Sequence, residues 1–338
     1  MNLPTKRIIP MENSRLQRGE LHEVDFSPKL RASSVLFTDR LEQEHYDALA
    51  QRVPVISEEY ECMVRRASGL RIFPHKTVES QRSAHIVGFG EIFTKRSLER
   101  PLKIALKPFY NFEHAINEFN GYLWLGSIGI QTFQPVAIFP ALKGKHFIAT
   151  TVTRRDFMSL DRDDWVLGSR VKDERDLEIL ERNLNTVSDI ARKMAKINSM
   201  GGFLPDGQIK NWGVTNWGEI GALDTERFKL ISLGSDDAIV SMWDNVDSLF
   251  KSLIYTNNSN PNNELEGSIF GVGLLNGMST SQVREIFESF FIVPYCEELT
   301  EIQSNNQNGD VQVQCENLHS GILTNFYSNP DWPNHLLK

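Results

Sequence analysis

The polar residues from which the fold is inferred lie in the segment Leu204-Pro-Asp-Gly-Gln-Ile-Lys-Asn-Trp-Gly-Val-Thr-Asn-Trp-Gly-Glu-Ile-Gly-Ala-Leu-Asp224. This segment places two carboxylates and one amide at fixed separations, at Asp206, Asn211 and Asp224. A short apolar segment separates the amide from the second carboxylate. Carboxylate and amide oxygens are ligands that hard divalent cations prefer, so the spacing of these three residues matters for function.

The segment between Asn211 and Asp224 has the pattern of a β-hairpin. Trp212-Gly-Val-Thr and Glu219-Ile-Gly-Ala-Leu are strand candidates, and Asn216-Trp-Gly between them is a turn signal. Such a hairpin brings Asn211 and Asp224 to adjacent strand ends, where both can reach one Mg²⁺. In the alternative interpretation, Asp206 and Asn211 only cap turns beside glycine, as these residue types often do.

A strand candidate with a lysine at its end lies upstream, in Pro101-Leu-Lys-Ile-Ala-Leu-Lys107. Its alternation places Ala105 and Lys107 on one face, opposite the face of Leu102, Ile104 and Leu106. A lysine that ends an edge strand is often simply solvated. A functional role for Lys107 therefore depends on the motifs that precede and follow it in the sequence.

Two glycines precede this strand, in Ser83-Ala-His-Ile-Val-Gly88-Phe89-Gly90-Glu-Ile-Phe93. The pattern predicts an apolar strand that Gly88 and Gly90 interrupt and that resumes beyond them. Glycines let backbone N–H groups approach a phosphate, because no Cβ stands in the way. A strand bulge explains the same two glycines equally well.

A helical pattern follows Lys107, in Phe112-Glu-His-Ala-Ile-Asn-Glu118-Phe-Asn-Gly-Tyr-Leu-Trp-Leu125. Glu118 is the best ion-pair partner for Lys107 in this stretch, and Glu113 is the second choice. A partly buried lysine needs such a partner, and the pair fixes where the ammonium group points.

These motifs, in this order, resemble the protein-kinase-like superfamily. The nearer likeness is to aminoglycoside and choline phosphotransferases and to lipopolysaccharide-kinase-like bacterial proteins. Their loop commonly reads His-Gly-Asp-x4-Asn, followed later by Ile-Asp-x-Glu. The corresponding stretches here are Leu204-Pro205-Asp206 and Leu223-Asp224-Thr225-Glu226.

The resemblance implies a role for each motif residue. Asp206 is the expected catalytic residue, and Asn211 and Asp224 are the expected Mg²⁺ ligands. ATP binding is expected to involve Lys107, Glu118, Ala105, Gly88 and Gly90, with a main-chain hinge near Thr151 to Thr153. By the Asp-x-Glu pattern, Glu226 orients the metal or the loop.

The function implied is an ATP- and Mg²⁺-dependent phosphotransferase, a kinase that acts on an alcohol group of a small molecule or a protein. Two departures weaken the resemblance: Leu204 replaces the usual histidine, and Thr225-Glu226 replaces Phe-Gly. Ala-Pro-Glu is also missing after Asp224, so a regulated eukaryotic-type protein kinase is disfavoured. Two alternatives keep the fold: a pseudokinase that serves as a nucleotide-binding scaffold, and an enzyme that transfers AMP.

The expected fold is α+β with two lobes and an N-terminal extension. Residues 1–78 form the extension, with little structure expected up to about residue 30 and two helical patterns between 38 and 66. Residues 79–152 form a small antiparallel-sheet N-lobe with one helix, and residues 153–338 form a mainly helical C-lobe. Within the C-lobe, helices are predicted at 172–198, 238–255 and 279–291.

Composition restricts the function further. The chain has 338 residues, 40% of them apolar and 24% charged, which suits a globular protein of this size. Its net charge of -8 argues against nucleic acid as a partner. Three well-separated cysteines and the lack of a signal peptide or an apolar membrane span predict a soluble, cytoplasmic protein.

Overall fold

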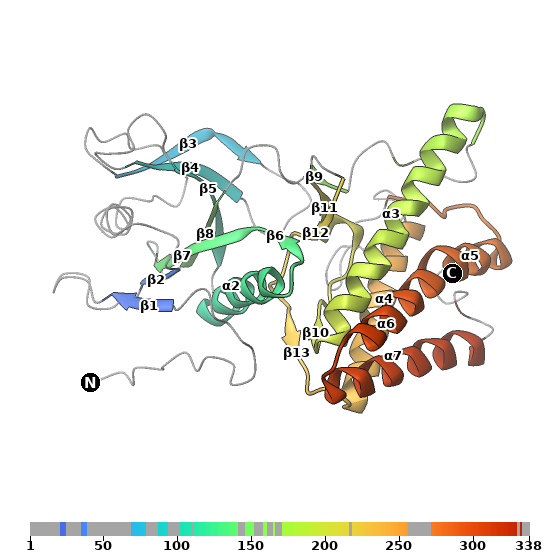
Figure 1. The fold of residues 1–338 in the computed structure, drawn as a ribbon. Coiled ribbons are helices and arrows are strands. Elements are labelled where there is room, and N and C mark those ends of the chain that lie inside the picture. The colour runs from blue at the N-terminus through green and yellow to red at the C-terminus, as the bar shows by residue number, and fades with distance from the viewer. Residues whose placement is uncertain are drawn as a thin grey trace.

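The computed structural model describes residues 21–24, 35–38, 69–78, 87–93, 102–109, 111–140, 146–151, 158–160, 165, 171–215, 218–255, 272–329 and 332. Over these residues the protein is an α+β structure. Figure 1 shows a sheet with helix α2 on one side of the molecule and helices α3 to α7 on the other. The candidate site residues lie where these two parts meet.

Seven antiparallel strands form the large sheet, in the order β1-β2-β7-β8-β5-β4-β3. Their bounds are β1 Leu21–Val24, β2 Val35–Thr38, β3 Gly69–Val78, β4 Val87–Phe93, β5 Leu102–Phe109, β7 Gln134–Pro140 and β8 His146–Thr151. The boundary expected between residues 78 and 79 falls inside this sheet, because β3 pairs with β4 and β2 pairs with β7. Strand β1 lies within residues 1–30, for which the sequence predicts little structure.

The interruption predicted at Gly88 and Gly90 is absent from strand β4. The two glycines lie inside a continuous strand, opposite Leu106 and Ile104 of β5. The only irregularity in the described part of the β3–β4 pairing lies in β3, between Phe73 and Val78. Gly90 pairs on both sides, with Ile72 of β3 and Ile104 of β5, whereas Gly88 pairs only with β5 and lies opposite the register shift of β3. The segment is therefore a strand rather than a loop, with a bulge-like irregularity next to Gly88.

Helix α2, Phe112–Ser127, packs against the sheet. It begins after Asn111, whose side-chain oxygen accepts a hydrogen bond from the backbone N–H of Glu113 at 2.8 Å. Its apolar face joins strands β5 and β7 in a buried cluster of Phe109, Ala115, Phe119 and Ile138. This contact fixes the side of α2 that faces β5, and Glu118 lies on that side.

The helical part contains α3 Glu174–Ser199, α4 Asp236–Ile254, α5 Thr280–Phe287, a π-helical turn Glu288–Ile292, α6 Val293–Asn305 and α7 Gly309–Ser328. The first three helices confirm the predictions within a few residues at each end. Gly201 follows α3 with a φ of 81°, a left-handed conformation that glycine adopts readily at the end of a helix. The sequence patterns do not predict α6 or α7.

Small sheets connect the two parts of the molecule. One contains β6 Gln131–Thr132, β12 Ile220–Ala222, β11 Trp212–Val214 and β9 Met158–Ser159, in that order. In the other, β10 Gly202–Phe203 pairs with β13 Lys229–Leu230. Thr132 of β6 donates a hydrogen bond from Oγ1 to the Ala222 carbonyl oxygen at 2.8 Å. The hairpin next to Asp224 is therefore tied directly to the chain that follows α2.

Several predictions lie outside the described residues. These are the helical patterns between residues 38 and 66, beyond Thr38, and hinge residues 152 and 153. Thr38 itself ends strand β2, and Thr151 ends strand β8. Within the described residues, none of the helices has the length and apolarity needed to cross a bilayer.

Candidate functional site

Helix α4 holds the loop that carries Asp206. The buried Asn245 side chain is satisfied when its amide nitrogen donates to the Leu204 carbonyl oxygen at 2.6 Å and its oxygen accepts from the Leu204 N–H at 3.2 Å. About two turns further along α4, Ser252 accepts a hydrogen bond at Oγ from the Ile209 N–H at 2.9 Å. The loop is thus fixed at both ends by side chains of one buried helix.

Within this loop, Asn211 and Asp206 are directly connected. The Asn211 side chain is buried and donates from Nδ2 to the Asp206 carbonyl oxygen at 2.8 Å. The Asp206 carboxylate is half-buried, and among the described residues no hydrogen bond or ion pair engages it. A carboxylate held by its backbone and left without a partner is available to a ligand.

The predicted hairpin is confirmed. Strands β11 and β12 pair with Trp212 opposite Ala222, and one step further the Leu223 N–H donates to the Asn211 carbonyl oxygen at 2.8 Å. Asp224 is the next residue. Asn211 and Asp224 therefore lie at the same end of the hairpin, as the sequence predicts.

Lys107 of β5 lies between two carboxylates. Its Nζ is 2.6 Å from Glu118 Oε2 and 3.2 Å from Asp224 Oδ1. The predicted pairing of Lys107 with Glu118 is confirmed, whereas Glu113 is exposed on another part of α2. The Lys107 side chain is 14% exposed and that of Glu118 is 1% exposed, so this ion pair connects the sheet to α2 in a largely buried position.

The charged groups in this cluster shift one another's pKa values. Burial would lower the pKa of Lys107, but the carboxylates of Asp224 and Glu118 raise it well above its usual range. Burial would raise the pKa of Asp224, but the Lys107 ammonium group lowers it. For Glu118, burial dominates over the attraction of Lys107 and raises the pKa to about 7. Asp224 is therefore the anionic partner of Lys107 over the widest pH range.

The Tyr122 hydroxyl acts against the effect of burial on the pKa of Glu118. The Tyr122 hydroxyl lies 2.5 Å from Glu118 Oε1 and 2.8 Å from the Leu223 carbonyl oxygen. A hydroxyl carries one proton, which serves only one of these two contacts well. In the structure the hydroxyl donates to Glu118 Oε1, which favours the charged form of Glu118 and lowers its pKa, so this contact opposes the effect of burial.

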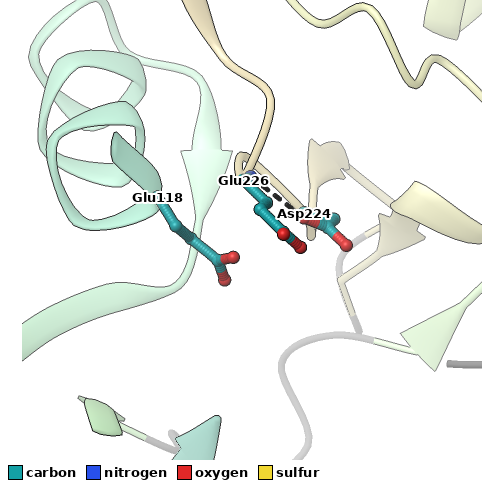
Figure 2. Close-up of side chains that lie close together, drawn as sticks. All are labelled: Glu118, Asp224 and Glu226. Atoms are coloured by element: carbon teal, nitrogen blue, oxygen red, sulfur yellow. Dashed lines mark hydrogen bonds between the residues drawn. The ribbon is translucent and has the colours of Figure 1, made fainter. Parts of the chain in front are cut away.

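Three carboxylates converge beside Lys107. Oxygens of Glu118, Asp224 and Glu226 all lie within 4.8 Å of one another, and Figure 2 shows Glu118 approaching from α2 and the other two from the segment after β12. Glu118 is occupied by Lys107, whereas Asp224 is bound only through Oδ1, by Lys107 and by the Glu226 N–H at 3.1 Å. Within the described residues, Oδ2 of Asp224 has no partner.

The remaining predicted residues lie in strands β4 and β5. Ala105 is buried and lies two residues before Lys107 on the same face of β5. Gly88 and Gly90 lie in the neighbouring strand β4 rather than in a loop. Sequence reasoning did not identify Tyr122, Asn117 or Asn245. The sequence does contain a sign of Tyr122, because this residue is one helical turn after Glu118 and thus on the same face of α2.

Comparison with known proteins adds no family to these observations. The chain matches no protein-family model, and no curated protein matches its sequence. What the site can do is therefore inferred from its geometry alone.

Proposed function

We propose that this protein is an ATP- and Mg²⁺-dependent phosphotransferase with a two-lobed, protein-kinase-like fold. The observation that carries the proposal is the position of Lys107, which contacts both Glu118 of α2 and Asp224 at the end of the hairpin. A lysine fixed in this way presents its ammonium group at a defined place, as the grip on a triphosphate requires. The antiparallel sheet with one packed helix, followed by a helical part, supports the same proposal.

The donor atoms present at the site fit Mg²⁺. The Asn211 amide nitrogen is used by Asp206, so the amide oxygen faces the other way, and Asp224 has Oδ2 available. An amide oxygen and a carboxylate oxygen at adjacent strand ends are suitable ligands for a hard cation that retains several waters. Bound Mg²⁺ would neutralise charge on the phosphates of ATP. Glu226 lies close enough to orient the metal site.

The protein's own residues then have separate tasks. Lys107 binds the phosphates, and Glu118 holds Lys107 in place. Asp206 orients the acceptor hydroxyl and accepts its proton, because it is the carboxylate of the loop without a partner among the described residues. Ala105 supplies an apolar surface of β5 for the adenine. The acceptor is a hydroxyl group on a small molecule or a protein.

Nucleotide binding is tested by thermal unfolding with and without ATP and Mg²⁺. A ligand at 100 times its dissociation constant stabilises the folded state by about 2.7 kcal/mol, which raises the midpoint by several degrees. We expect Lys107→Ala and Asp224→Ala to lose most of this rise. Lys229→Ala, at an exposed position in β13, is the control and should keep it. A folded wild type with no rise for any purine nucleotide would exclude both a kinase and a nucleotide-binding scaffold.

A further inference from the structure

Helix α2 is hydrogen-bonded to the segment that carries Asp224. Thr225 is fully buried and donates from Oγ1 to the Glu118 carbonyl oxygen at 2.8 Å. The residue after Asp224 thus binds the backbone of the residue that pairs with Lys107. The two carboxylates that contact Lys107 are therefore also connected to each other through Thr225.

Asn117 makes a second connection between the same two elements. Its Nδ2 donates to the Glu226 carbonyl oxygen at 2.7 Å and to the Phe228 carbonyl oxygen at 2.9 Å. One side chain of α2 thereby satisfies two backbone acceptors in a segment that has little regular structure. The segment is also held by bonds from the Leu223 N–H to the Asn211 carbonyl oxygen and from the Phe228 N–H to the Thr225 carbonyl oxygen, so the Asn117 bonds add to its order.

Close packing supports the hydrogen bonds. A Cβ on Gly121 would lie 2.7 Å from Thr225 Cβ, so the backbone of α2 approaches Thr225 more closely than any other residue type would allow. Further along the helix, the rings of Trp124 and Phe228 lie 5.1 Å apart. Polar and apolar contacts thus alternate along one face of α2, which leaves the helix little room to slide or rotate.

We propose that α2 and residues 223–228 form one rigid unit, here called the latch, in which Thr225 and Asn117 are positioning residues that keep Glu118 and Asp224 on Lys107 before any ligand binds. Kinase-like sites are controlled by movement of the helix that carries the lysine's glutamate partner. The latch opposes that movement, so the site is assembled without an activating modification. The consequence for catalysis rests on the proposed function, whereas the rigidity of the latch does not.

Two matched pairs of variants test the latch. Thr225→Val keeps the shape of the side chain but removes the hydroxyl donor, and Thr225→Ser restores a donor. Asn117→Ala removes the second connection. Asn120→Ala makes the same change on the same helix, at a residue with no bond to residues 223–228 among the described ones. Hydrogen–deuterium exchange of the full-length protein without ligand is measured in peptides that cover 112–127 and 223–228.

We expect Thr225→Val and Asn117→Ala to speed exchange roughly fivefold in both segments together, which corresponds to the loss of about one hydrogen bond. Thr225→Ser and Asn120→Ala should exchange like the wild type. Unchanged exchange in Thr225→Val would overturn the proposal. So would faster exchange in only one of the two segments, or an equal effect of Asn120→Ala.

A second measurement separates the latch from the proposed function. If the wild type uses ATP, Thr225→Val should raise the KM for ATP about fivefold with a smaller change in kcat, and Thr225→Ser should restore it. If the variants speed exchange in both segments while the wild type neither binds nor uses nucleotide, that result would support the latch and exclude the phosphotransferase. If the wild type is an active enzyme and its Thr225→Val variant keeps the wild-type KM and exchange rates, the phosphotransferase is retained and the latch is excluded.

Discussion

The Asn211 side chain donates a hydrogen bond from Nδ2 to the carbonyl oxygen of Asp206 at 2.8 Å. This bond determines which way the amide faces, because the opposite assignment would bring two oxygens together. The amide oxygen is left to face a ligand, while the Asp206 backbone is held for its carboxylate to act. One hydrogen bond therefore fixes the position of the proposed metal ligand relative to the proposed catalytic residue.

Asn211→Ala should weaken Mg²⁺ binding without unfolding the protein. The variant loses one proposed ligand, so the Mg²⁺ concentration that gives half of the ATP-induced stabilisation should rise about tenfold or more. Asn211→Asp is the matched variant. It keeps a ligating oxygen but loses the donor to Asp206, so it should show a smaller rise. An unchanged Mg²⁺ midpoint in Asn211→Ala would remove Asn211 from the metal site.

Asp206→Asn should separate binding from transfer. Asp206 has no partner among the described residues, and the phosphates are held by other groups. The variant should therefore retain nearly all of the ATP-induced stabilisation, while turnover falls by about 10²–10⁴-fold. Wild-type turnover in this variant would show that another residue orients the acceptor hydroxyl.

Glu118→Gln should reveal the raised pKa of Glu118. The ordinary pKa of the carboxyl group is 4.5, and in the folded protein it is about 7. Between these values the folded protein holds more protons than the unfolded chain, so the wild type loses stability as pH rises through this window. The variant lacks this titration. The free energy of unfolding of the wild type should therefore fall relative to the variant, on the order of 2 kcal/mol between pH 4.5 and 8.

Denaturant unfolding at several pH values checks this prediction. The direction is informative, because a Glu118 stabilised mainly as an anion by Lys107 would behave in the opposite way. A wild type that gains stability relative to Glu118→Gln as pH rises would show that the ion pair dominates over burial.

Asn245→Leu should destabilise the protein through the loop that carries Asp206. The substitution leaves the backbone N–H and carbonyl of Leu204 without their side-chain partner in a buried position, at a cost of about 2–3 kcal/mol. Asp244→Leu, at the exposed neighbouring position of α4, should change stability by less than about 0.5 kcal/mol. Chemical denaturation measures both, and equal effects would mean that Asn245 does not anchor the loop.

Local patterns predicted the parts of the site that depend on short-range structure. The hairpin from Trp212 to Ala222 follows from strand and turn residues, and the partner of Lys107 follows from helical spacing after the strand. Both motifs lie within a few residues of the groups they position, so sequence spacing largely determines their geometry.

The features that the sequence did not predict depend on long-range contacts. Gly90 remains in a strand because β3 and β5 both pair with it, and Gly88 because β5 pairs with it; single-residue propensity does not include such pairing. Strands β1 and β2 join the sheet through the pairing of β2 with β7, which lies about one hundred residues later in the sequence. Asn117 meets Glu226 across a separation of 109 residues, and its spacing within α2 gives no sign of this contact.

The proposed activity is the transfer of the γ-phosphate of ATP to a hydroxyl group. The most direct test incubates the protein with Mg²⁺, a cell metabolite extract and ATP labelled either at the γ- or the α-phosphate, beside Asp206→Asn. We expect only the γ-label to enter an acceptor, and we expect this transfer to fall by about 10²–10⁴-fold in the variant. Transfer of the α-label would indicate AMP transfer, and ATP binding without any transfer would indicate a scaffold. Either result would exclude transfer of the γ-phosphate as the activity of this protein.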